Sequence, residues 1–290
     1  MAGNSDQRRQ RLVVQRLREL PPLPLAAQQI LQVMDDPAVS MERIAGIIEQ
    51  DPALAGRILG LANSAFFRRN GEITTVREAI IRALGMDVVK SLALGMAMSG
   101  VFDASACPAF DLRRYWSSAF LTARCASHLG RELECSPPID PRPLFLCGLL
   151  HNFGLLALVH CFPEELDSAL RLLADHPGER LGGQEQRAMG MDHHQAGGWL
   201  GRKWHLPEVV ITVVEHHHEP DYEGPFAIEA KLVDICAQWA GALLEGAPLP
   251  AAEEERLLCL GLPEQALHRL ERSAAQMREE VDTLATQMAT

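Results

Sequence analysis

The sequence contains few signals for β-structure. No stretch alternates apolar and polar residues convincingly, and the nearest hairpin turn, Asn70-Gly71, is flanked by charged residues rather than by β-branched ones. Aromatic residues make up only 5% of the 290 residues, whereas leucine and alanine are abundant. These absences argue against a β-sandwich or a β-barrel. The composition favours an all-α protein in which helices pack on helices.

Cysteine pairs at metal-binding spacing are also absent. The seven cysteines include no C-x-x-C motif and their number is odd, which excludes a disulfide framework and a zinc ribbon. Residues 1–11 are polar and basic, without the apolar segment of a signal peptide, and no run reaches the ~20 apolar residues of a membrane span. We therefore predict a cytoplasmic protein whose reduced cysteines are small core residues.

An excess of basic residues is lacking as well. The formal net charge is −11. The overall electrostatic interaction of such a chain with nucleic acid or an anionic membrane would be repulsive. Neither nucleic acid nor a membrane is therefore an expected partner. Five arginines make the N-terminus locally basic, and we interpret them as a solvated helix face: Arg8, Arg9, Arg11, Arg16 and Arg18.

Helix start and stop signals recur along the chain. Ser40 and Asp51 are placed as N-caps, Pro52 suits a first helical turn, and Thr75 to Glu78 form a capping-box pattern closed by Gly85. The predicted helices are 24–34, 41–48, 52–62, 76–84, 87–96, 112–129, 143–159, 193–204, 207–216 and 227–244. The predicted loops are 136–143, 177–183 and 246–250.

The C-terminal stretch has a separate pattern. Its apolar residues recur in steps of three and four, as in a heptad stripe: Leu267, Leu270, Ala274, Met277, Val281, Leu284 and Met288. One interpretation is an amphipathic helix lying on its own domain. The alternative is a helix-to-helix contact that makes a homodimer.

Two polar side chains interrupt the otherwise apolar stretch from Phe145 to Val159. They are His151 and Asn152, and a helix that is apolar on all sides is buried in the middle of a domain. They can be buried polar groups bonded to each other, to backbone carbonyls or to a water. If Asn152 were an aspartate, the pair would have the composition of a metal-ligand doublet.

Several stretches together resemble the HDOD domain, the HD-related output domain of bacterial signalling proteins. In the family's order they are LPPLPLAAQQIL (20–31), IIEQDPALAGRILGLANSAFF (47–67), ITTVREAIIRALG (73–85), GLLHNFG (148–154), and the pair W-x-L-P (204–207) and HHEP (217–220). The resemblance implies an all-helical fold related to the HD phosphohydrolases. Those enzymes hold one or two metal ions with a histidine, a His-Asp doublet, further histidines and a final aspartate.

The sequence departs from that ligand set at three positions. By the resemblance, the first histidine falls at Ser118, the doublet reads His151-Asn152, and the final aspartate falls at Ala237. The matching histidines that remain are His151, His193, His217 and His218, and Asp234 lies nearly one helical turn before Ala237. Of the adjacent pair His193 and His194, we expect one to face the cleft and the other to face solvent.

The missing carboxylates have a chemical consequence. An amide oxygen is a much weaker ligand than a carboxylate for Mn, Fe or Mg, so a bridged pair of cations is not expected. If one borderline cation binds, the expected ligands are His151, His193, His217 and Asp234. We therefore expect no catalytic residues and no cofactor. The positions that match the HD ligand set would form a vestigial pocket.

The resemblance also implies an organisation of the chain. We predict a linker helix at 1–19, the HDOD domain at 20–222, and a C-terminal helical extension at 223–290 that completes the core. Within the HDOD domain, 20–130 would be the N-terminal helical part and 131–222 a degenerate HD-like core.

Three functions are compatible with this organisation. The first is a non-catalytic output module that binds a signalling protein or a small ligand and transmits its state through helix packing. The second is a metal-dependent phosphohydrolase or phosphodiesterase. The third is a module that binds a nucleotide or cyclic dinucleotide without cleaving it.

Overall fold

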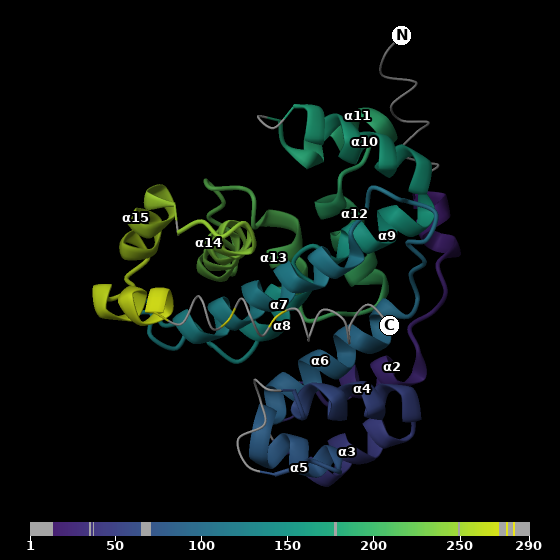
Figure 1. Cartoon of the computed structure of the whole chain (residues 1–290), viewed down its shortest axis with the longest axis vertical. Helices are drawn as coiled ribbons and strands as arrows, with labels where there is room; N and C mark the ends of the chain where they lie inside the picture. Colours follow the sequence, from purple (N-terminus) through teal and green to yellow (C-terminus); the bar gives the residue numbers. More distant parts are fainter. Residues whose placement is uncertain are drawn as a thin grey trace.

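The computed structural model describes residues 14–34, 36, 38–64, 71–176, 179–248, 250–272, 277 and 281. Within these residues every regular element is a helix, as predicted (Figure 1). The first group comprises α2 (Leu25–Gln32), α3 (Met41–Glu49), α4 (Pro52–Ala62), α5 (Val76–Glu78), the π-helix η1 (Ala79–Leu84) and α6 (Met86–Ser99). These helices gather at one end of the molecule.

The remaining helices build the centre and the opposite end. They are α7 (Leu112–Leu129), α8 (Leu144–Leu150), α9 (Phe153–Cys161), α10 (Pro163–Asp175), α11 (Leu181–Met189), α12 (His193–Lys203), α13 (Glu208–His216), α14 (Ala227–Leu244) and α15 (Ala251–Cys259). Helix α7 packs on α8 and α14, α9 packs on α12, and α6 joins the first group to α8. Helices α10 and α11 lie at the far end from α3 to α5 (Figure 1).

The predicted capping side chains are in place. The Ser40 hydroxyl accepts a hydrogen bond from the Arg43 N–H at 3.1 Å, and the Asp51 carboxylate accepts from two amides of the first turn of α4. Thr75 accepts from the Glu78 N–H, but the Glu78 carboxylate accepts from the Thr74 amide, one residue before the expected one. These contacts fix where the helices of the first group begin.

Three predicted boundaries are wrong. The apolar helix predicted from Pro143 onward is broken at His151-Asn152, where α8 ends and α9 begins. The predicted loop 177–183 is shorter than expected, because α11 begins at Leu181. The first helix also ends at Gln32 rather than Met34. Apolar periodicity alone could not show a break between two helices that are both buried on all sides.

One continuous hydrophobic core connects both groups of helices. The stretch Leu144–Cys161, with mean hydropathy 1.8, is long and apolar enough to cross a membrane by composition, which the sequence analysis did not anticipate. However, 83% of it is buried inside the fold, as in the core helix of a globular domain. Five cysteines are buried, as predicted, but Cys135 is half-buried and Cys259 is exposed.

The helical residues 14–19 lie against the body of the protein. Leu17 is fully buried, and the Arg16 guanidinium donates to the Cys161 carbonyl at 2.6 Å while its charge lies over the Phe162 ring. Arg16 and Arg18 are both exposed, as predicted for the N-terminal arginines, and Arg16 in addition bonds the body of the protein. Arg8, Arg9 and Arg11 lie outside the described residues.

The C-terminal apolar stripe is partly visible. Leu267, Leu270, Met277 and Val281 are buried in the chain's own core. Ala274, Leu284 and Met288 lie outside the described residues. The observed burial favours a helix lying on its own domain, and a homodimer through this segment stays a prediction.

Candidate functional site

The break between α8 and α9 places His151 at the centre of the molecule. Two glycines allow this placement: a Cβ on Gly148 would lie 2.6 Å from the Cα of Ala123 in α7, and a Cβ on Gly154 would lie 2.7 Å from the backbone nitrogen of Gly197 in α12. These backbone-to-backbone contacts hold both sides of the break. The His151 side chain is 1% exposed, and its Nδ1 lies 2.7 Å from the Gly148 carbonyl oxygen.

Helix α12 presents two histidines from its first turn. A complete capping box between Asp192 and Gln195 fixes the start of this helix. The backbone N–H and the Nδ1 of His193 lie 2.9 and 2.6 Å from the same oxygen of Glu185, whose side chain is 0% exposed. The Nδ1 of His194 lies 3.0 Å from the Val214 carbonyl oxygen.

The end of α13 contributes two more histidines. His217 Nδ1 lies 2.8 Å from the Val213 carbonyl oxygen, and His218 Nδ1 lies 2.9 Å from Asp234 Oδ1 in α14. The third histidine of the triplet, His216, stacks on Tyr222 at 4.1 Å and bonds Glu219. The chain turns after α13, so His217 and His218 both reach the same centre although they are neighbours in sequence.

The imidazole rings form one connected cluster. His151 lies 5.2 Å from His217, His217 lies 4.7 Å from His194, and His194 lies 3.9 Å from His193 and 4.9 Å from His218, measured between ring centroids. The expectation that His193 or His194 faces solvent is therefore wrong. His194 lies between the other rings. It is in the first turn of α12, where it contacts His193 of the same helix and His217 and His218 at the end of α13.

The hydrogen bonds define the tautomers. A carbonyl oxygen and a carboxylate can only accept, so the Nδ1 of each of the five rings carries the proton and donates it. In a neutral ring the lone pair is then on Nε2. The Nε2 atoms of His151 and His217 are buried and have no protein partner. Imidazoles oriented through Nδ1 with a free Nε2 are the arrangement found at metal sites.

Burial keeps most of these rings neutral. Desolvation, assisted by neighbouring histidines, lowers the pKa of His151 to about 4 and of His194 to about 2, and lowers the pKa of His217 well below its ordinary value. For His193, desolvation lowers the pKa, but attraction to Glu185 outweighs it and leaves the pKa raised. The cluster therefore offers several neutral imidazoles at neutral pH.

Both oxygens of the Asp234 carboxylate are bonded to other side chains. Its Oδ1 accepts from His218, and its Oδ2 lies 2.7 Å from the Arg256 guanidinium, which also bonds Glu253 at 2.5 Å. Burial raises the pKa of Asp234, but hydrogen bonds from His218 and Arg256 outweigh that effect and hold the pKa below its ordinary value. Arg256 therefore neutralises the charge that a metal ion would need.

The donor set does not fit a bridged pair of hard cations. Such a pair needs carboxylates between the ions, yet position 152 is an asparagine, whose Oδ1 is buried without a partner, and Asp234 is bound by Arg256. The set does fit one borderline cation. Potential ligand atoms of His193, His194 and His218 all lie within 4.8 Å of one another. Of the ligands expected from sequence, only His193 belongs to this group.

Some predicted pocket positions have no visible role. Ser118 in α7 and Ala237 in α14 are half-buried, and none of the hydrogen bonds or ring contacts found among the described residues joins them to the histidines. Sequence reasoning missed Glu185, His194 and Arg256. Arg256 follows three consecutive glutamates, a pattern typical of an exposed helix face. The sequence around Glu185 contains no feature that predicts its burial.

Comparisons with known proteins agree with this architecture. The family model described as HDOD domain matches residues 20–220. An uncharacterized protein of Treponema pallidum (strain Nichols) is 27% identical over 208 residues, which cover 71% of this chain; this chain spans 39% of that protein's length. The described helical fold is also shared with solved structures.

Two solved structures illustrate the likeness. A protein assigned to signal transduction from Marinobacter aquaeolei VT8 is similar with a TM-score of 0.83 and 25% identity, covering 99% of this chain and 66% of that one. A protein named as a phosphohydrolase from Shewanella amazonensis SB2B has a TM-score of 0.76 and 24% identity, covering 96% and 98% of the two chains. With the family match over residues 20–220, the chain belongs to the HDOD domain family.

Proposed function

We propose that this chain is a non-catalytic regulatory module of signal transduction that works in the cytoplasm. One observation carries the proposal: the carboxylates that bond the cluster already have partners, Asp234 in Arg256 and Glu185 in His193, and Asn152 replaces the doublet aspartate. Two bridged cations could not be charge-balanced there, and without them a bound water is not made acidic enough to attack phosphorus. The likeness to a protein assigned to signal transduction supports the same role.

Helix α12 provides a path along which the state of the histidine cluster can be transmitted. It begins at His193 and ends at Lys203, whose amine donates to the carbonyls of Leu17, Arg18 and Leu20 at 3.1 to 3.2 Å. Those carbonyls close the helical residues 14–19. A ligand or a protein partner that shifts α12 at the cluster would therefore move the N-terminal segment.

A second candidate function rests on a specific observation. His193, His194 and His218 could hold one borderline cation such as Zn²⁺. Such an ion would supply Lewis acidity to a bound phosphate ester. On this alternative the chain is a mononuclear metal-dependent phosphohydrolase, and the cluster is a catalytic site.

One experiment separates the two candidates. Untagged protein is screened for hydrolysis of bis(p-nitrophenyl) phosphate and of a nucleotide panel with added Mn²⁺ or Zn²⁺, alongside His151→Ala and His194→Ala. The regulatory proposal predicts no turnover above the metal-only blank. Turnover that disappears in both variants would instead establish the hydrolase.

The variant Asn152→Asp tests the ligand argument directly. We expect no hydrolysis from this single change, because Asp234 remains bound to Arg256 and positions 118 and 237 supply no ligand. The double variant Asn152→Asp with Arg256→Ala frees both carboxylates and is the matched comparison. Hydrolysis by the single variant, in the same screen, would show that the pocket had lost only one ligand.

A further inference from the structure

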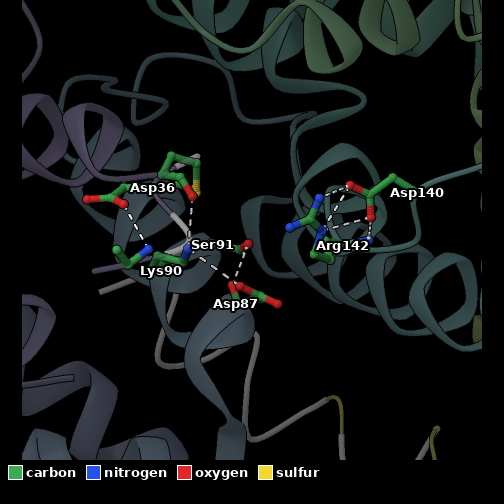
Figure 2. A network of polar contacts seen from close by, with 8 residues as sticks. Asp36, Asp87, Lys90, Ser91, Asp140 and Arg142 are labelled. Carbon is green, nitrogen blue, oxygen red and sulfur yellow. Dashed lines mark hydrogen bonds and ion pairs between the residues drawn. The ribbon is translucent and has the colours of Figure 1, made fainter. Parts of the chain in front are cut away.

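A cavity lies away from the histidine cluster, between the two groups of helices. Its volume is about 740 Å³, and residues of α6, α8, α13 and α14, together with residues that follow α2, line it. This size is in the range of sites for small organic molecules. Figure 2 shows Lys90, Asp87 and Ser91 on one side of the gap and Asp140 with Arg142 on the other.

The charge of the cavity wall is unbalanced. Five acidic and two basic side chains line it, which leaves a net charge of minus three. Both cations already have partners: Lys90 donates to the Met34 carbonyl at 2.8 Å and pairs with Asp87 at 3.4 Å, and Arg142 forms a bidentate pair with Asp140. The cavity therefore has no cation left for its remaining acids.

One of those acids is buried without a cationic partner. Glu229, in the first turn of α14, is 7% exposed and lines the cavity; its carboxylate accepts a hydrogen bond from its own backbone N–H, but no ion pair to it is found among the described residues. Burial, together with the nearby charge of Asp140, outweighs that hydrogen bond and raises the pKa of Glu229. A buried carboxylate without a countercharge is costly unless a ligand supplies one.

An aromatic ring accompanies this carboxylate. Phe226 precedes α14, three residues before Glu229, and also lines the cavity. Its backbone has φ of 58°, a left-handed conformation that costs energy for a bulky residue, and its side chain is 38% exposed. An exposed ring beside a carboxylate is the combination that recognises organic ammonium groups.

The rest of the wall is largely apolar. Met34, Met86, Leu146 and Val209 contribute to it. A hydrated metal ion gains nothing from such a surface, whereas an amine with a hydrocarbon body gains from burial.

We propose that this cavity binds a small organic monocation, an amine with an apolar body whose charge pairs with Glu229 and lies against the Phe226 ring. The ligand would contact both groups of helices, so its binding would fix how they pack. This inference goes beyond the regulatory role proposed for the histidine cluster and does not depend on it, because no residue is shared between the two sites.

The test uses phenethylamine as the probe and 2-phenylethanol as its neutral counterpart. Both are titrated into the full chain by ligand-observed NMR and calorimetry. We expect saturable binding of phenethylamine with Kd below about 1 mM, and binding of the alcohol at least about tenfold weaker. Glu229→Gln should weaken amine binding by at least about tenfold, and Phe226→Leu should weaken it several-fold.

Glu255→Gln, an exposed acid of α15 outside the cavity, is the matched control and should bind like the wild type. Circular dichroism of each variant checks folding, and Glu229→Gln should not lower Tm, because it removes a buried charge that has no countercharge. The proposal is overturned if phenethylamine shows no saturable binding to folded wild-type protein up to about 10 mM. Equal binding of the amine and the alcohol, or equal affinity of Glu229→Gln and wild type, would overturn it as well.

Discussion

At the residue scale, the histidine cluster combines several neutral rings with two carboxylates that already have partners, Asp234 with Arg256 and Glu185 with His193. His151, His194 and His217 have lowered pKa values, chiefly because burial disfavours the imidazolium. His193 is the exception, since Glu185 compensates its burial. The cluster is therefore suited to donate lone pairs, and it is unsuited to balance the charge of two divalent ions.

These pKa shifts predict that the fold is sensitive to mild acid. Between about pH 6.5 and the folded-state pKa of about 4, the unfolded chain protonates His151 and the folded chain does not, so stability falls as the pH falls. From His151 alone we expect a loss of roughly 2 kcal/mol by about pH 5, which His193 opposes in part. Urea denaturation of metal-free, untagged protein at about pH 7.5 and about pH 5 measures the loss.

The variant His151→Gln isolates this contribution. Its stability should depend less steeply on pH than that of the wild type over the same window. His176→Gln, a change at an exposed histidine, is the control and should leave the wild-type dependence intact. If His151→Gln and wild type lose stability in parallel, the buried ring does not titrate as described.

At the element scale, two glycines determine how the cluster is assembled. A side chain on Gly154 would meet the backbone of His193 and Gly197, so Gly154→Ala should force α9 and α12 apart. We expect a loss of on the order of 3 kcal/mol in the free energy of unfolding. Gly56→Ala in α4 meets nothing within 4 Å and should instead gain up to about 1 kcal/mol. Equal effects of the two variants in denaturant titrations would contradict the close crossing.

The contact between α12 and the N-terminal segment is a second prediction at this scale. Lys203→Met removes three hydrogen bonds to the carbonyls that end the helical residues 14–19. We expect faster amide hydrogen exchange at residues 14–20, corresponding to a loss of about 1–2 kcal/mol of local stability. Lys231→Met, in α14, should leave that segment unchanged. Unchanged exchange in the Lys203 variant would remove α12 as the route of transmission.

Most elements could be predicted from the sequence, because caps and periodicity are local. Helix α12 begins at His193, as predicted, and α7 and α14 have the predicted bounds. The site was less predictable because its geometry is not local. The break at His151-Asn152 depends on helices that cross at Gly148 and Gly154, and the role of Arg256 depends on α15 lying beside α14. Spacing in the sequence could not place His194 among the other rings.

At the scale of the whole molecule, the C-terminal segment belongs to the same core as the HDOD helices. Leu267 is 2% exposed within the continuous core. Leu267→Ala should therefore lower the free energy of unfolding by about 2–5 kcal/mol, without separating any oligomer first. Gln265→Ala, on the exposed face of the same stretch, is the control. An unfolding midpoint that depends on protein concentration in the wild type and not in Leu267→Ala would instead favour a dimer contact.

The part of the chain that the structure describes also contains two distinct polar centres. One is the histidine cluster between α8, α12 and α13, and the other is the acidic cavity between the two groups of helices. A regulatory module needs a place that senses and an element that moves. The acidic cavity lies between the groups, and α12 connects the histidine cluster to the N-terminal segment.

The most direct test of the account is elemental analysis of untagged protein after dialysis with Mn²⁺, Fe²⁺ or Zn²⁺ and gel filtration. The shortage of free carboxylates at Asn152 and Asp234 predicts at most one retained divalent ion per chain, without phosphodiester turnover. Two retained ions per chain, together with turnover that is lost in His151→Ala, would contradict it.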